Sequence, residues 1–171
     1  MAEVLGSWSG MRKYLEQEMM ADSLKGRIRY GCTSYKGMDG LCVFEICIDG
    51  KQFKRFSWET VNSYFIENGY KESRKPSDLR EYWEGFHLLL GKNPVNDRTE
   101  YTDGEFAQAL KEYRNQDIQK SVRSENHLVR MFAILDRRVG KRTLIKMKEE
   151  IGLQPEWLQQ LYILRTDAEM I

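Results

Sequence analysis

The sequence is poor in the residues from which metal sites and most active sites are built. It has 2 histidines, 3 cysteines and 3 prolines among 171 residues. Metal sites need cysteine, histidine or carboxylate side chains gathered at ligand spacing, and the sequence shows no such cluster, so we predict no metal and no other cofactor. The segment GSWSG near the start has Trp8 where a nucleophilic serine would be required, and there is no glycine-rich phosphate loop. These absences argue against an enzyme.

Signals for export or for a membrane are also missing. Residues 1–17 have neither the basic start nor the apolar run of a secretory signal, and no stretch approaches the roughly 18 apolar residues of a membrane span. The formal net charge of +1 favours neither nucleic acid nor an anionic membrane as a partner of the whole surface. Cys32, Cys42 and Cys47 are odd in number and confined to one region, which does not suggest a disulfide framework. We therefore expect a reduced, cytoplasmic protein without a membrane partner.

The N-terminal part alternates between helical and strand-like patterns. Apolar spacing predicts a helix capped by Ser7 or Ser9 and ended by Gly26. Period-two alternation then predicts strands at residues 27–35, 41–49 and 51–57, joined by a loop at 36–40 and a tight turn at residues 49–50. Phe53 and Phe56 differ in parity, which predicts a bulge in the third strand. A second helix is predicted from residue 57, with Ser57 as its cap, to residue 69.

The predicted three-stranded meander has one apolar face, which needs a cover. The opposite face carries basic and aromatic residues, namely Arg27, Arg29, Thr33 and Tyr35, with Lys54 nearby. Solvent is the usual neighbour of such a face in an antiparallel sheet. A basic aromatic docking surface is the functional alternative.

Residues 77–171 show helical patterns without strand signals. A charged connector holding Pro76 is the best boundary, and about five helices follow, with Ser77 and Ser124 as predicted caps. The predicted fold class is α+β, with a three-stranded antiparallel meander flanked by helices (α-β-β-β-α) and then a helical C-terminal half. We expect two parts, 1–69 and 77–171, which form one compact domain if the C-terminal helices cover the apolar sheet face.

The segment from Asp136 to Lys148 is the most charged of the chain, with six basic side chains and one acidic one. It either forms a corner between two helices or binds anions such as phosphates, and the candidate binding residues are Arg137, Arg138, Lys141 and Arg142. Lys141 and Arg142 begin a helix, where cations are disfavoured by the dipole. We therefore expect them to have acidic partners among Asp136, Glu149 and Glu150.

Two nucleic-acid-binding folds and one hydrolase site share features with these patterns. Residues 144–163 resemble a helix-turn-helix unit around Gly152, but Lys148 occupies a position that usually holds a small residue, so a helical hairpin is favoured. The order α-β-β-β-α occurs in double-stranded-RNA-binding domains, but the second helix lacks their phosphate-binding lysines. His87 is expected to be partly buried. A small hydrolase based on His127 and a nearby acid remains an alternative.

Several segments resemble an uncharacterised bacterial protein family of about this size. They are WSGMRKYLEQ, SLKGRIRY, DGK, RMFAILDRRVGKRTL and PEWLQQLYILRTDAEMI. The resemblance implies a cytoplasmic bacterial protein and carries over no activity, substrate or catalytic residue.

Together these patterns predict a non-enzymatic module that docks a macromolecule through its surface. A protein partner is expected rather than nucleic acid, and homo-oligomerisation is left open. The main alternative is a nucleic-acid-binding protein that uses the basic corner and the last two helices.

Overall fold

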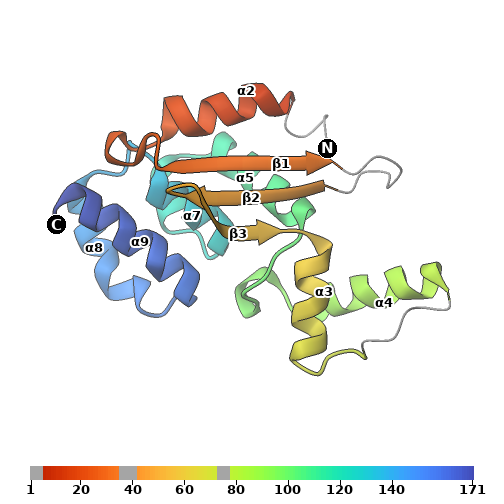
Figure 1. The fold of residues 1–171 in the computed structure, drawn as a ribbon. Coiled ribbons are helices and arrows are strands. Elements are labelled where there is room, and N and C mark those ends of the chain that lie inside the picture. Colours follow the sequence, from red (N-terminus) through yellow and green to blue (C-terminus); the bar gives the residue numbers. More distant parts are fainter. Residues whose placement is uncertain (1–5, 35–41, 73–77) are drawn as a thin grey trace.

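A computed structural model describes residues 6–34, 42–72 and 78–171 of the chain. It confirms the predicted fold class, because a three-stranded antiparallel sheet is flanked by helices and followed by a helical half (Figure 1). The strands are β1 (Ile28–Ser34), β2 (Cys42–Ile48) and β3 (Lys51–Phe56). The α-helices are α2 (Trp8–Lys13), α3 (Trp58–Glu67), α4 (Leu79–Lys92), α5 (Asp103–Asn115), α6 (Ile118–Val122), α7 (His127–Leu135), α8 (Lys141–Ile151) and α9 (Glu156–Glu169).

The sheet has the predicted meander order β1-β2-β3. Asp49 and Gly50 form the turn between β2 and β3, and both have positive φ angles, of 50° and 80°, as a tight hairpin turn requires. Ile46 pairs with Lys54 but Cys47 pairs with Gln52, so Phe53 is the extra residue of a bulge. The bulge predicted in the third strand is thus confirmed. The predicted loop at 36–40 lies outside the described residues.

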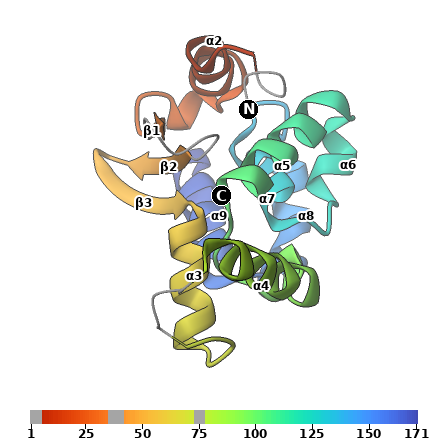
Figure 2. The ribbon, with the colours of Figure 1, turned by 90° about the vertical axis from the view of Figure 1, so that its right-hand side faces the viewer.

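Helices of the C-terminal half cover the inner face of the sheet. Figure 2 shows α5, α7 and α9 on one side of the three strands. The ring of Phe106 in α5 lies 4.4 Å from that of Phe44 in β2 and 5.4 Å from that of Phe132 in α7, measured between ring centroids. One hydrophobic core therefore joins residues of the sheet to residues of the later helices.

The predicted first helix over residues 7–26 is wrong as a single element. Ser7 caps α2 as predicted, but the chain continues as a π-helical segment, η1 (Tyr14–Met19), and a short 3-10 helix, η2 (Asp22–Leu24). The break falls at Met20, which forms a β-bridge with Asp136. The Ala21 amide donates to the carbonyl of Leu135 at 2.9 Å, so tertiary hydrogen bonds replace the helical ones.

Helices α3 and α4 form a small unit beyond the end of β3 (Figure 1). Ser57 caps α3 as predicted, because its hydroxyl accepts from the amide of Thr60 at 3.2 Å. Asp78 caps α4, and the predicted cap Ser77 lies outside the described residues, as does Pro76 of the connector. A separate cluster of Val61, Phe65 and Phe86 holds the two helices together.

The later helices differ from the predicted ones at their boundaries. The long polar helix divides into α5 and α6, because Asp117 caps a new helix by accepting from the Gln119 amide at 2.7 Å. Asn126 caps α7 in place of the predicted Ser124, whose hydroxyl instead accepts from the Asn126 amide at 3.2 Å. Helix α7 ends at Leu135 because Asp136 adopts an extended conformation. The loop before α5 contains a 3-10 turn, η3 (Val95–Asp97).

Candidate functional site

The predicted basic corner lies between α7 and α8, and two of its four candidate residues make structural contacts. The carboxylate of Asp136, which is 1% exposed, accepts from Arg138 Nη2 at 2.7 Å and from Arg138 Nε at 3.1 Å. The Tyr113 hydroxyl and the backbone amide of Arg138 donate to the same carboxylate. The hydrogen bond to Asp136 is also the main cause that raises the pKa of Arg138. Arg138 therefore neutralises a buried acid.

Lys141 is engaged at the other end of the corner. Its ammonium donates to the backbone carbonyl of Glu169 at 2.6 Å, where α9 ends. A cation is favourable at the C-terminus of a helix, so Lys141 stabilises α9 rather than pairing with an acid of its own helix. The expectation of acidic partners among Asp136, Glu149 and Glu150 is therefore not met for Lys141.

Arg137 and Arg142 are the two candidate residues whose side chains make no structural contact of this kind. Both are exposed, and neither forms an ion pair or a side-chain hydrogen bond with any residue that the structure describes. Only the backbone of Arg137 is engaged, because its amide donates to the Met19 carbonyl at 2.8 Å. The corner thus combines two structural cations with two that can bind a partner.

The outer face of α8, defined here as Arg142, Ile145, Lys146, Glu149 and Leu153, continues from these cations. These residues recur at helical spacing, opposite the buried residues Leu144, Met147 and Ile151. Ile145 is 57% exposed and Leu153, just after the helix, is 87% exposed. Helices α8 and α9 lie at the end of the molecule opposite α4 (Figure 1).

In the segment that resembles a helix-turn-helix unit, polar side chains of α9 form hydrogen bonds with the turn and with α8. The side-chain amide of Gln159 donates to the carbonyls of Gly152 at 3.3 Å and Gln154 at 2.7 Å, in the turn that joins the helices. The Tyr162 hydroxyl donates to the Leu144 carbonyl at 2.8 Å. These bonds hold α8 and α9 together and engage the Gln159 amide, which a recognition helix would present to a base.

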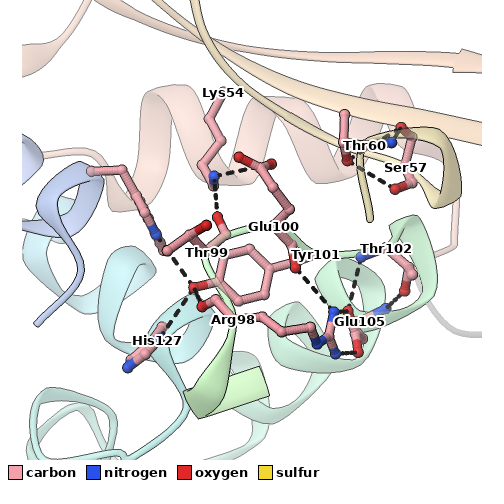
Figure 3. Close-up of polar contacts among 11 residues, drawn as sticks. Lys54, Ser57, Thr60, Arg98, Thr99, Glu100, Tyr101, Thr102, Glu105 and His127 are labelled. Atoms are coloured by element: carbon pink, nitrogen blue, oxygen red, sulfur yellow. Dashed lines mark hydrogen bonds and ion pairs between the residues drawn. The ribbon is translucent and has the colours of Figure 1, made fainter. Parts of the chain in front are cut away.

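A second polar centre surrounds Tyr101 and was not predicted (Figure 3). The Tyr101 hydroxyl donates to the Arg98 carbonyl at 2.8 Å and accepts from Trp157 Nε1 at 3.3 Å. His127 Nδ1 lies 3.1 Å from the same hydroxyl. Because the Arg98 carbonyl can only accept, a Tyr101 hydroxyl that donates to it is free to accept from an N–H at Nδ1 of His127.

His127 lacks the partner that a hydrolase mechanism would need. A catalytic histidine of the triad type is oriented by a carboxylate, whereas His127 contacts a phenol, and no hydrogen bond joins it to an acid within the described ranges. Burial is the main cause that lowers the pKa of His127, and the charge of Arg130 lowers it further, whereas Asp97 raises it. The site therefore favours a neutral, structural histidine.

The lowered pKa of His127 should make folding stability depend on pH. In the unfolded chain His127 has the ordinary histidine pKa of 6.5, and in the folded protein its pKa is lower. Below pH 6.5 the unfolded chain therefore binds a proton more readily than the folded one. Stability should therefore fall as the pH falls through this value. The variant His127→Asn keeps a donor for Tyr101 without titrating. Chemical denaturation at about pH 7.5 and about pH 5.5 should show a larger loss for the wild type. An equal loss in both proteins would contradict this assignment.

Lys54 was expected near the solvent face of the meander, and this expectation is wrong. The bulge at Phe53 turns Lys54 inward, where its ammonium donates to the Thr99 carbonyl at 2.7 Å and to Glu100 Oε2 at 3.3 Å. It also lies 4.9 Å from the ring centroid of Trp157. Burial lowers the pKa of Lys54, and Glu100 opposes that shift. Lys54 therefore fixes β3 to the segment before α5.

Arg98 anchors the same segment and was missed from the sequence. Its guanidinium donates to the carbonyls of Asn93 at 2.6 Å and Glu100 at 3.0 Å, and it pairs with the carboxylate of Glu105. Glu105 and Thr102 form a capping box at the start of α5. The TDGE segment was the available sequence signal for that box, but no pattern indicates that an arginine completes it.

The remaining candidates for chemistry have ordinary surroundings. His87 was expected to be partly buried, but it is exposed. Cys42 is buried in the core with Sγ 3.6 Å from Asp103 Oδ2, and burial raises its pKa and that of the half-buried Cys32. In the part of the chain that the structure describes, no group of three histidine, cysteine or acidic residues could hold a metal ion.

These features define an α+β protein whose antiparallel sheet is packed against a helical C-terminal half. The chain belongs to the SF0329 protein family, an uncharacterised family whose model matches residues 7–166. No curated protein and no solved structure matches it. None of the helices within residues 6–34, 42–72 and 78–171 has the length and apolar character needed to cross a bilayer.

Proposed function

We propose that this protein is a non-enzymatic interaction module that binds another protein through the outer face of α8. The observation that carries the proposal is the exposure of Ile145 on α8 and of Leu153 just after that helix, at 57% and 87%. Single exposed aliphatic residues are common, but two of them beside cations that form no ion pair make a surface that a partner can bury.

The charges around these side chains indicate the chemistry of the partner. Arg137, Arg142, Lys146 and Lys148 are exposed and form no ion pair with the described residues, and Glu149 lies among them. A partner segment with acidic side chains would be attracted and oriented by these cations. Apolar side chains in the same segment would bury Ile145 and Leu153, which supplies affinity.

A protein partner fits this surface better than a nucleic acid does. Arg138 and Lys141 already hold Asp136 and the end of α9, so they have fewer donors left for phosphates. The exposed side chains of Ile145 and Leu153 have no complement in a phosphate backbone. A second copy of the chain is also disfavoured, since two copies of this face would bring like charges together.

The cytoplasm of a bacterium is the proposed setting, as the resemblance to the bacterial family implied. Its support in the structure is chemical. Cys32, Cys42 and Cys47 carry thiols rather than disulfides, which suits a reducing compartment.

The test is photo-crosslinking in the native cell with a photoreactive residue in place of Lys146. The cross-linked partner peptide is expected to be acidic and to contain apolar residues. Adding Arg142→Glu and Leu153→Ser should abolish the cross-link, because the pair removes one charge contact and one apolar contact. Arg123→Glu, which changes an exposed arginine after α6, is the matched control and should leave the cross-link unchanged.

Folding controls separate binding from stability. Arg137→Glu with Arg142→Glu should change the melting temperature by less than about 2 °C, since neither side chain has a structural partner. Arg138→Glu with Lys141→Glu should lower it clearly, because both side chains do. A cross-link that survives Arg142→Glu and Leu153→Ser would contradict the proposal. So would a salt-sensitive nucleic-acid shift that Arg137→Glu and Arg142→Glu abolish, or dimerisation through this face in light scattering.

A further inference from the structure

A polar groove of about 810 Å³ lies where β3, α3 and the segment Thr99–Glu100 meet. The strand wall contributes Lys54 and Arg55, and the helix wall contributes Glu59, Ser63 and Glu67. It is separate from the outer face of α8, and none of its residues has been given a role in the proposed function. Its volume falls in the range of small-molecule sites.

The strand wall holds one guanidinium nitrogen, Nε of the half-buried Arg55, that has no partner among the described residues. This nitrogen atom is itself buried, and the guanidinium forms no ion pair with the described residues. Its neighbour Lys54 already donates to Thr99 and Glu100. Buried donors are nearly always paired, so an unpaired one beside a groove indicates a missing acceptor. A carboxylate is the acceptor whose two oxygens match a guanidinium.

The helix wall has the opposite charge. Glu59, Ser63 and Glu67 follow one another at intervals of four residues and therefore share one side of α3. All three are exposed, and neither carboxylate is paired with a cation in the described parts of the chain. The groove thus has one unpaired cation on the strand wall and two unpaired anions on the helix wall.

We infer that this groove binds a small amphoteric molecule, such as an amino acid or a short peptide. Its carboxylate binds Arg55 and its ammonium group binds a carboxylate of the helix wall, Glu59 or Glu67. A ligand that is only anionic is repelled by the helix wall, and a ligand that is only cationic leaves Arg55 unpaired. The inference does not depend on the partner proposed for α8.

The test is a titration of isotope-labelled full-length protein followed by NMR. Glycylglycine, L-lysine and L-glutamate are the amphoteric probes, and acetate and methylammonium each carry one of the two charges. At least one amphoteric probe is expected to shift the Arg55 Nε–H signal, which Arg55→Met identifies by its disappearance. The single-charge probes should bind at least about tenfold more weakly, because each lacks one contact.

Variants distinguish the site from its surroundings. Arg55→Met should weaken the amphoteric probe at least about tenfold without lowering the melting temperature, since the lost donor had no partner. Arg123→Met is the control and should bind like the wild type. Glu59→Gln with Glu67→Gln should weaken the amphoteric probe but strengthen acetate. The inference is overturned if no amphoteric probe gives saturable shifts up to about 20 mM, well above a Kd near 1 mM. Acetate or methylammonium binding as tightly as the amphoteric probes would also overturn it.

Discussion

Replacing Asp136 with alanine is expected to lower the free energy of unfolding by about 3 kcal/mol. The variant loses the charged hydrogen bonds from Arg138 and leaves the Tyr113 hydroxyl without its acceptor in the core. Arg138 is 39% exposed, so water can solvate it again, and most of the cost falls on Tyr113. Urea denaturation followed by tryptophan fluorescence measures the change.

A surface aspartate provides the control for this experiment. Asp22 also pairs with a cation, Lys25, but its side chain is 85% exposed. Asp22→Ala should therefore leave stability nearly unchanged. If the two variants lost similar free energy, the burial of Asp136 would not be the cause of its effect.

Replacing Arg98 with methionine should also cost about 3 kcal/mol of unfolding free energy. Arg98 is 1% exposed, and its loss leaves the carbonyls of Asn93 and Glu100 without their donor and the carboxylate of Glu105 with only the Thr102 amide. Methionine keeps the apolar stem, so the change reports on the charged group. Chemical denaturation again gives the free energy.

The exposed pair of Arg80 and Glu84 provides the comparison for Arg98. Its atoms are 2.9 Å apart, but both side chains are largely solvated. Arg80→Met should therefore cost less than about 1 kcal/mol. A cost for Arg98→Met as small as this would show that the segment before α5 is held mainly by Lys54.

The fold class could be predicted because its signals are local. Period-two alternation marked the strands, Asp49 and Gly50 marked the hairpin turn, and the parity of Phe53 and Phe56 marked the bulge. The same bulge turns Lys54 inward, which alternation along the strand alone does not predict. The first helix was predicted as continuous because the bridge between Met20 and Asp136 joins positions that no local pattern connects.

The candidate site was only partly predictable for the same reason. The charge of the corner and the pairing of Arg138 with Asp136, two residues away, are local, but the burial of Asp136 and the contact of Lys141 with the end of α9 depend on the tertiary structure. Tyr113 and Glu169, which share those contacts, are each more than 20 residues away. Arg98 and Arg55 carry no periodic signal, because the burial of guanidinium atoms is decided by how distant segments fold around them.

The separate cluster of Val61, Phe65 and Phe86 has a consequence for how the chain opens. Helices α3 and α4 share few apolar contacts with the main core. They can therefore unfold together as one cooperative unit while the sheet and the later helices remain native. The helix wall of the groove belongs to this less stable unit, whereas its strand wall belongs to the core. A ligand that bridges the two walls would therefore couple two cooperative units and slow amide hydrogen exchange across α3.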